Sequence, residues 1–394
     1  MLSKAHVIAA LEAKREGFDG FDLRTGEELQ RYEEALDWLA DQDVADLLQE
    51  LEPLKRPGAR PTAERTAGQP IVRPFGQRFA NHQEARAWAM GVLQGVTTLA
   101  VDGSQITPSR DFTVPVGAVQ VGWFENPHDQ GKDYVKDIRF EVLPPDDLAG
   151  EMDEVGGYPD LKVNLRRFQL ECEVLVEHMR RDAGRAPAPV CFFDGSLVIS
   201  FAAQMRPELQ RAYLHAVRSL LDTSEETRVP LVGYVDTSYA SDLVTMLGCL
   251  TRDARPTNLA DGLLLRRRMA WGDRTEAFVC ARDDRLFERA NQELDYYQRV
   301  HLVYLKTTAE NAPVRLDLPA WLLEAEELER VLDIVRAECV VGTGYPYAVE
   351  TVDALAVITV ADQERFYRAF QEFMETLNVK LRYSRKAYSK RTRR

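Results

Sequence analysis

Val101-Asp102-Gly103-Ser104 and its near copy, Phe193-Asp194-Gly195-Ser196, are the stretches that decide the fold of this chain. Each follows an apolar run rich in β-forming residues, at 96–101 and at 190–193. The pattern predicts two strands that each end at an aspartate, with a glycine that lets the backbone turn sharply. If the two strands lie side by side, their carboxylates form a site suited to a divalent metal ion. A single Asp-Gly-Ser is more typical of a turn or a helix cap, so the prediction depends on the second copy.

The composition is that of an ordinary globular protein, with 394 residues of which 45% are hydrophobic and 29% charged. No apolar run is long enough to span a bilayer, and the N-terminus lacks the apolar core of a signal peptide. We therefore expect a cytoplasmic protein without a membrane segment. The five cysteines are scattered, with no CxxC pair, which favours reduced thiols over a disulfide framework or a zinc site.

We expect three parts along the chain: a helical N-terminal extension that ends in a Pro-rich linker (1–90), a main domain (91–379) and a basic tail (380–394). The apolar spacing near the N-terminus predicts two or three amphipathic helices. Residues 53–70 are rich in proline and glycine and poor in apolar residues, which is typical of a linker or a mobile loop.

The first part of the main domain alternates between strand and helix patterns. Strands are predicted at 97–102, 113–124, 134–143, 188–193 and 229–235, and helices at 161–181 and 202–221. Three hairpin-linked strands followed by alternating helices and strands are the order expected of an RNase H-like mixed β-sheet. The predicted fold class is therefore α/β, with an RNase H-like mixed sheet flanked by helices and an N-terminal helical extension. Later in the chain, a helix at 346–358 is expected to run into a strand.

One glutamate on the first helix of the main domain faces the interior. Glu171 lies between Phe168 and Leu175 on the apolar face, by helical periodicity. An inward carboxylate is unfavourable unless it is paired or binds a metal. Asp102, Glu171 and Asp194 then form an acidic triad in the order strand, helix, strand. Such carboxylates can hold two metal ions that bind the attacking water and the leaving oxygen of a phosphodiester.

Two neighbouring assignments stay open. Glu173, on the opposite side of that helix, is the second choice if Glu171 is not the ligand. Asp236 follows the predicted strand at 229–235 and is either a further ligand or the cap of a helix at 239–247.

Four blocks of the sequence resemble the NurA nuclease family, over about residues 95–370. They are Val-Asp-Gly-Ser, Phe-Phe-Asp-Gly-Ser-Leu, Gly-Tyr-Val-Asp-Thr-Ser-Tyr-Ala-Ser-Asp-Leu and Gly-Tyr-Pro-Tyr-Ala-Val-Glu-Thr-Val-Asp. The resemblance implies that the main domain is a nuclease, with Mn²⁺ or else Mg²⁺ as cofactor. The implied activities on DNA are 5′-to-3′ exonuclease and single-strand endonuclease. The resemblance also implies a homodimer and a HerA-like hexameric ATPase as partner in end resection at double-strand breaks.

The resemblance assigns roles to individual residues as well. Asp102, Glu171 and Asp194 match the acidic metal ligands of the family, and Tyr345 matches a loop tyrosine. Asp353 falls where many members have a histidine. Aspartate can bind the metal in its place, but it does not supply a general acid or base that titrates near neutral pH.

The net charge of −13 argues against nucleic acid as a partner, but the charge is unevenly distributed. The last fifteen residues hold eight Lys or Arg, two tyrosines and no acidic residue. They form either an arm for nucleic acid or a solubilising tail. Two other functions stay open: a nuclease that acts on RNA or RNA–DNA hybrids, and a non-catalytic adaptor that grips DNA for a ring ATPase.

Overall fold

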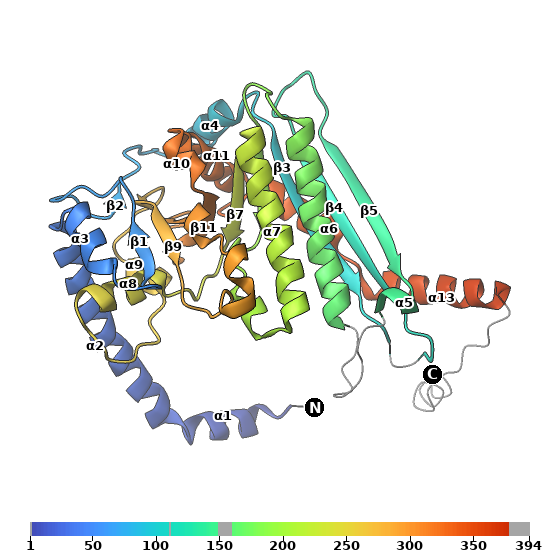
Figure 1. Ribbon diagram of the computed structural model, residues 1–394, viewed down its shortest axis with the longest axis horizontal. Helices are drawn as coiled ribbons and strands as arrows, with labels where there is room; N and C mark the ends of the chain where they lie inside the picture. Colours follow the sequence, from blue (N-terminus) through green and yellow to red (C-terminus); the bar gives the residue numbers. More distant parts are fainter. Residues whose placement is uncertain (1, 110–111, 149–159, 378–394) are drawn as a thin grey trace. The chain divides into compact units, whose positions relative to one another are not determined.

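The structure is a computed structural model, and it describes residues 2–109, 112–148 and 160–377. The predicted basic tail lies outside these residues. The chain divides into two compact units (Figure 1), and each is assembled from segments that are distant in sequence. The first unit comprises Met1–Arg78, Val235–Asp283 and Tyr297–Ala320, and the second Phe79–Tyr234, Asp284–Tyr296 and Trp321–Arg394. The predicted boundary at residue 90 does not coincide with this division.

A mixed β-sheet forms the centre of the second unit, with the strand order β7-β6-β3-β4-β5. Its strands are β3 (Thr98–Ile106), β4 (Gly117–Asn126), β5 (Val135–Leu143), β6 (Val190–Asp194) and β7 (Leu231–Val235). β3, β4 and β5 form an antiparallel meander, whereas β6 runs parallel to both β3 and β7. This order confirms the predicted RNase H-like mixed sheet.

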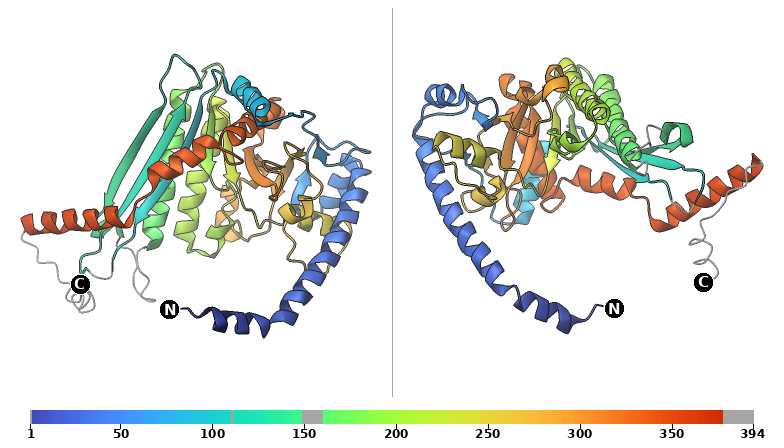
Figure 2. Two further views of the ribbon diagram at one scale, coloured as in Figure 1. Left: turned by 180° about the vertical axis from the view of Figure 1, so that it is seen from behind. Right: turned by 60° about the horizontal axis from the view of Figure 1, so that its bottom comes forward.

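Helices cover both faces of this sheet. α6 (Asp160–Arg181) and α7 (Pro207–Thr227) lie on one face (Figure 1), and α12 (Tyr347–Ala356) and the start of α13 (Val360–Thr376) lie on the other (Figure 2). The other helical segments described in this unit are α4 (His82–Leu93), α5 (Pro145–Leu148), η1 (Ser200–Gln204), η2 (Arg289–Leu294), α10 (Trp321–Glu324) and α11 (Leu328–Val341).

Two predictions about these helices are wrong. The helix expected at 202–221 begins later, because Pro207 occupies the first turn of α7 and the separate 3-10 helix η1 precedes it. The strand expected after α12 is a helix instead. The Thr359 side chain caps the N-terminus of α13 in a capping box with Asp362, which starts a new helix at once.

An antiparallel sheet forms the centre of the first unit, in the order β1-β9-β10-β11. Its strands are β1 (Gly58–Pro61), β9 (Phe278–Ala281), β10 (Val300–Leu305) and β11 (Val314–Pro319), with the short β2 (Val72–Arg73) and β8 (Arg274–Thr275) beside them. The helices described in this unit are α1 (Lys4–Glu12), α2 (Arg15–Ala40), α3 (Val44–Leu51), α8 (Asp242–Leu250), α9 (Asp261–Leu265) and η3 (Tyr297–Arg299).

The Pro-rich segment is an ordered part of this sheet, so the prediction of a linker there is wrong. β1 lies inside the segment, and its Ala59 is fully buried. Gly58 has a φ of 90°, and a Cβ atom there would lie 2.4 Å from the carbonyl oxygen of Asp242. Arg65 is buried against Glu276. Glycine and proline here suit a tight edge strand and do not indicate flexibility.

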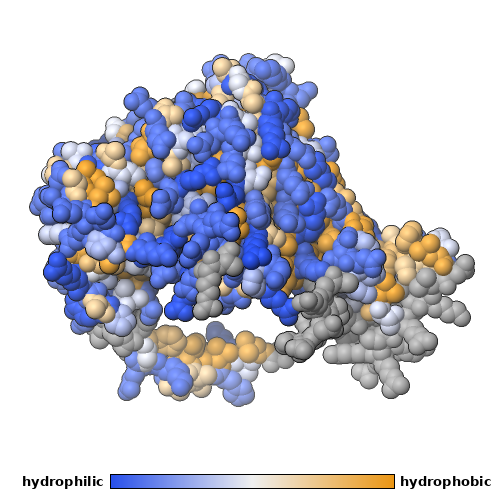
Figure 3. Space-filling model, in the orientation of Figure 1, coloured by the Kyte–Doolittle hydropathy of each residue, from blue (hydrophilic) through white to orange (hydrophobic). Residues whose placement is uncertain are grey.

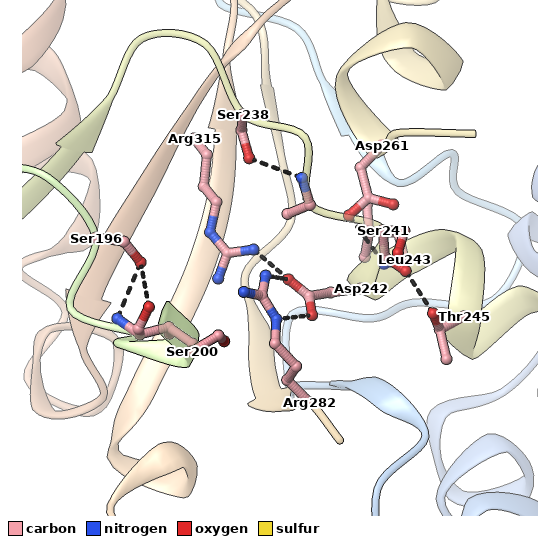
Figure 4. Close-up of polar contacts among 12 residues, drawn as sticks. Ser196, Ser200, Ser238, Ser241, Asp242, Leu243, Thr245, Asp261, Arg282 and Arg315 are labelled. Atoms are coloured by element: carbon pink, nitrogen blue, oxygen red, sulfur yellow. Dashed lines mark hydrogen bonds and ion pairs between the residues drawn. The ribbon is translucent and has the colours of Figure 1, made fainter. Parts of the chain in front are cut away.

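Buried charges hold α8 against this sheet (Figure 4). The Asp242 carboxylate accepts hydrogen bonds from Arg282 at 2.8 and 2.5 Å, and Arg315 donates to the same carboxylate. Arg315 also donates to Asp317 at 2.7 Å. Asp261 accepts hydrogen bonds from two backbone N–H groups in the first turn of α8 and so acts as its cap. Because the two arginines balance Asp242 and Asp317, these charges can be buried.

The predicted N-terminal helices are confirmed as α1, α2 and α3. α1 has no buried residue, and hydrophobic side chains such as Ile8 and Leu11 gather along it (Figure 3). None of the described helices combines the length and the hydrophobicity that crossing a membrane requires. All five cysteines are free thiols, as predicted.

Candidate metal centre

Asp102 lies in the middle of β3, so the prediction that it ends a strand is wrong. β3 continues to Ile106 and pairs with β4 along this whole stretch. The neighbouring β6 does end at Asp194, as predicted. The parallel ladder between β3 and β6 joins Val101 to Phe193, so Asp102 and Asp194 occupy the next positions on adjacent strands.

Glycines beside Asp102 allow two helices to approach the sheet closely. A Cβ atom on Gly103 would lie 2.5 Å from Oε1 of Glu171 on α6. A Cβ atom on Gly122, the β4 residue opposite Asp102, would lie 3.2 Å from Leu355 on α12. The glycine of the first Asp-Gly-Ser therefore serves close packing and not the predicted turn.

Glu171 points inward from α6, as predicted, and is 4% exposed. Arg167, one turn earlier, donates from Nη1 to Oε1 of Glu171 at 2.5 Å and to the carbonyl oxygen of Gly103 at 3.2 Å. Among the described residues, no side chain donates to the other oxygen of Glu171. Arg167 thus joins α6 to the strand that carries Asp102. Our sequence reasoning missed it, although an Arg four residues from a Glu on a helix is a signal for an ion pair.

The second Asp-Gly-Ser forms the predicted turn. Gly195 has a φ of 146°, and the Ser196 hydroxyl closes the turn on the backbone of Val198 (Figure 4). The Asp194 side chain is exposed, and the Tyr345 hydroxyl donates to its Oδ1 at 3.1 Å. The structure therefore brings together two residues that lie far apart in the sequence.

A tight loop before α12 presents Tyr345. Gly344 has a φ of 108°, and a Cβ atom on Gly342 would lie 2.1 Å from the carbonyl oxygen of Tyr345, so both positions require glycine. The Tyr345 ring packs edge-to-face on Tyr234 of β7, with ring centroids 5.1 Å apart. The glycine-rich sequence thus fixes the tyrosine against the sheet.

α12 carries Asp353 on an exposed position, and its first turn is fixed by a buried carboxylate. Glu338 of α11 accepts a hydrogen bond from the backbone N–H of Ala348 at 2.9 Å and one from the Thr98 hydroxyl of β3 at 2.8 Å. Sequence reasoning missed Glu338 too. The signal was there, since a lone glutamate in an apolar stretch of a helix must find partners.

The last turn of α12 is fixed as well. The carbonyl oxygen of Ala356 accepts a hydrogen bond from Ser104 at 2.5 Å and another from Gln120 at 3.2 Å. Ser104 and Gln120 are partners across β3 and β4. The serine of the first Asp-Gly-Ser therefore positions the helix that carries Asp353.

Burial and mutual repulsion raise the pKa values of two of the carboxylates. Burial raises the pKa of Glu171 to about 7, and Asp102 and Asp194 add to the effect of burial while Arg167 opposes it. Burial also raises the pKa of Asp102 to about 6, with Asp194 and Asp353 adding to the shift. Asp102 therefore lies within electrostatic reach of Glu171, Asp194 and Asp353.

The carboxylates do not yet stand at coordination distance. Among the described residues, no three His, Cys, Asp or Glu side chains come close enough together to hold a metal ion. Their chemistry nonetheless fits a hard divalent cation, because all the donors are carboxylate oxygens and one oxygen of Glu171 accepts no hydrogen bond. A bound cation would offset the mutual repulsion of these carboxylates.

Two assignments left open by the sequence can be compared with the structure. Glu173 lies on the outer side of α6, where Arg166 pairs with it at 2.6 Å, so Glu171 and not Glu173 faces the sheet. The interpretation of Asp236 as the cap of the following helix is wrong, because the N-cap of α8 is Ser241.

The strand order, with helices on both faces, is that of the RNase H-like fold class, and the candidate carboxylates lie on two adjacent strands and two flanking helices. A family model described as the NurA domain matches residues 96–358, which is more than half of the chain. The chain belongs to the NurA family, and the predicted resemblance is confirmed.

Solved structures with a similar fold include two of NurA. One is 10% identical, with a TM-score of 0.42, and the match covers 71% of this chain and 89% of that chain. Another, described as bound to dAMP and manganese, is 12% identical, with a TM-score of 0.34 and coverage of 68% and 85%. The catalytic domain of human Endonuclease V is 13% identical, with a TM-score of 0.33 and coverage of 75% and 89%. None of the curated proteins matches the sequence.

Proposed function

We propose that this protein is a Mn²⁺-dependent deoxyribonuclease that hydrolyses phosphodiester bonds as a 5′-to-3′ exonuclease and as a single-strand endonuclease. The observation that carries the proposal is the placement of Asp102 and Asp194 at neighbouring positions of adjacent strands, with Glu171 pointing inward from α6 and Asp353 close enough to raise the pKa of Asp102. A solved NurA structure is described as bound to dAMP and manganese, which supports manganese as the ion and DNA as the substrate for this member of the family. Mg²⁺ is the second choice of cofactor.

Each residue has a proposed role. Asp102 and Asp194 hold the ions from adjacent strands, and the unbonded oxygen of Glu171 completes their ligand set. Asp353 binds a second ion or its water. Tyr345, whose hydroxyl already reaches Asp194, orients water or a phosphate oxygen. When bound, the divalent ions activate the attacking water and stabilise the leaving oxygen.

The proposed partners follow from the family and not from the geometry of the site. We propose a homodimer that works with a HerA-like hexameric ATPase in the end resection of double-strand breaks. Analytical ultracentrifugation of the full chain, alone and with such an ATPase, tests both statements. A monomer that does not bind the ATPase would contradict them.

A matched pair of variants on α6 tests the site. Glu171→Gln should abolish cleavage of a 5′-labelled single strand in Mn²⁺, because it removes an inward carboxylate. Glu173→Gln, two residues away on the outer side, should cleave like the wild type. Asp102→Asn and Asp194→Asn should be inactive as well, with circular dichroism spectra like that of the wild type. Equal cleavage by the two glutamine variants would contradict the assignment.

The same assay distinguishes the competing functions. Comparing 5′- and 3′-labelled DNA gives the polarity, and replacing DNA with RNA or an RNA–DNA hybrid tests the RNA alternative. For the adaptor alternative, calorimetry with Mn²⁺ is decisive. An adaptor shows no binding, or binding that Asp102→Asn does not change, whereas a nuclease binds Mn²⁺ and loses that binding in the variant.

A further inference from the structure

Phe201 is an exposed aromatic residue on the segment that follows Asp194 in the chain. It belongs to η1, the 3-10 helix that follows the turn at Asp194, and 54% of the residue is exposed. Its sequence neighbours Ile199 and Ala202 are fully buried. A phenylalanine that stays in water beside buried neighbours calls for an explanation, because burying such a ring is favourable.

A cluster of aromatic rings connects Phe201 to the site. Phe193, the residue before Asp194, packs edge-to-face on Phe168 of α6, with ring centroids 5.7 Å apart. The ring centroids of Phe168 and Tyr213 of α7 lie 4.9 Å apart. Those of Tyr213 and Phe201 lie 5.2 Å apart, with an interplanar angle of 88°. Phe201 is therefore the exposed end of a packed cluster that begins beside a carboxylate of the site.

Polar side chains hold the segment that carries Phe201. The Ser200 hydroxyl donates to Asp284 at 2.7 Å. The Gln210 amide donates to the carbonyl oxygen of Ala203 at 3.0 Å, and Asn291 donates to Gln210 at 2.7 Å. η1 is thus fixed from several sides, and the ring is held in its exposed position by the fold.

We propose that Phe201 is a stacking platform for a nucleobase of the single DNA strand in the candidate metal centre, an inference that rests on the proposed function. Tyr213 and Phe168 pack against Phe201 at interplanar angles of 88° and 73°, and more than half of the residue is exposed, so part of the ring is accessible to a base. Stacking accepts every base, which suits a nuclease that moves along a strand.

Equilibrium binding of single-stranded DNA tests the proposal. The probe is a fluorescein-labelled oligothymidine, titrated with the full chain in Ca²⁺ in place of Mn²⁺ to hold back cleavage and followed by anisotropy. Phe201→Ala should weaken binding by roughly 5- to 100-fold, the usual effect of losing one stacked base. Phe201→Leu should weaken it similarly, because leucine covers Tyr213 but has no aromatic face, whereas Phe201→Trp should bind like the wild type. Phe18→Ala, at a phenylalanine of α2 that is 60% exposed, is the matched control and should change nothing.

An abasic scan gives a sharper readout. Oligonucleotides that each lack one base are compared, and in the wild type one position should show the loss of affinity that stacking predicts. In Phe201→Ala that loss should disappear, since no platform remains for the base. The inference is wrong if Phe201→Ala and Phe201→Leu bind like the wild type, or if the abasic loss persists in both. Circular dichroism checks that each variant is folded. If the alanine variant is unfolded, the binding of Phe201→Leu decides the test.

The test also separates this inference from the proposed function. If the wild type cleaves single-stranded DNA and Asp194→Asn does not, while the Phe201 variants bind normally, the inference alone fails. If the wild type neither binds nor cleaves single-stranded DNA, both fail.

Discussion

At the scale of single residues, the carboxyl group of Asp102 shows how packing in the candidate site raises a pKa. Burial is the main reason why its pKa rises to about 6, and Asp194 and Asp353 add repulsion. In the unfolded chain the pKa of an aspartate is about 3.9. Between these values the folded protein binds more protons than the unfolded chain. The free energy of unfolding of the metal-free protein therefore falls as the pH rises through this window.

Asp102→Asn should remove this part of the pH dependence. In EDTA, we expect the free energy of unfolding of the wild type to decrease between pH 4 and pH 7. The decrease should be smaller in Asp102→Asn, by on the order of 1–2 kcal/mol after allowance for solvent screening. Urea unfolding at several pH values measures the difference. Glu173→Gln should follow the wild type, because its carboxylate lies on the outer side of α6. Identical pH profiles for Asp102→Asn and the wild type would contradict the prediction.

The residues of the site were predictable to different degrees. Asp194 could be placed because a strand, a glycine and a turn coincide there, and Glu171 because helical periodicity points it inward. The position of Asp102 within its strand could not be predicted. A glycine after an aspartate can either form a turn or leave room for a helix packed on the strand, and the sequence is the same in both cases. At Gly103 only the close approach of α6 in the folded protein distinguishes these roles. The pairing of Arg167 with Glu171 follows helical spacing, but its contact with Gly103 exists only once α6 lies on β3.

At the scale of elements, Glu338 links three of them. Its buried carboxylate joins α11 to the first turn of α12 and to β3. Both of its oxygens accept hydrogen bonds, which an apolar side chain of similar size cannot do. The position of α12, and with it the Tyr345 loop, depends on this carboxylate.

Glu338→Leu should therefore destabilise the protein by about 1–3 kcal/mol, because the buried backbone N–H of Ala348 would lose its hydrogen-bond acceptor. Urea unfolding measures the change, and amide exchange should show faster exchange at the first turn of α12. Glu324→Gln, at an exposed glutamate of α10, serves as the control with little effect. Unchanged exchange in α12 would show that Glu338 does not hold it.

The order of elements in the second unit was predictable because its strands and helices alternate locally. The ordered strand β1 was not. A short segment rich in proline and glycine carries the composition of a loop, and its pairing partner, β9, lies more than 200 residues later in the chain. No local pattern reports such a pairing.

At the scale of the whole molecule, the chain has a net charge of −13 but ends in a strongly basic stretch. A DNA-binding protein of this charge needs cations concentrated where the strand passes. The tail, residues 380–394, is our candidate for that contribution, and it carries eight Lys or Arg.

Deleting residues 380–394 should weaken the binding of single-stranded DNA and flatten its dependence on salt. Each phosphate contact with a single strand contributes about 0.7 to the slope of log affinity against log salt, so the loss of eight basic residues should lower the slope by up to about 6. Anisotropy titrations at several salt concentrations measure it, and cleavage of short substrates in low salt should persist. An unchanged slope would mean that the tail does not contact DNA.

The two attachments of α12 have a consequence for the choice of metal. A helix fixed at its first turn by Glu338 and at its last by Ser104 cannot slide along the sheet, so Asp353 adjusts only by rotating its side chain. Across the sheet, Glu171 is held by one oxygen through a side chain that can itself move. Ions of different radius would thus meet a ligand with a fixed backbone position at Asp353 and a more adjustable ligand at Glu171. If both residues bind the proposed ion, the fixed position of Asp353 would limit the size of the ion, whereas Glu171 would adjust to it.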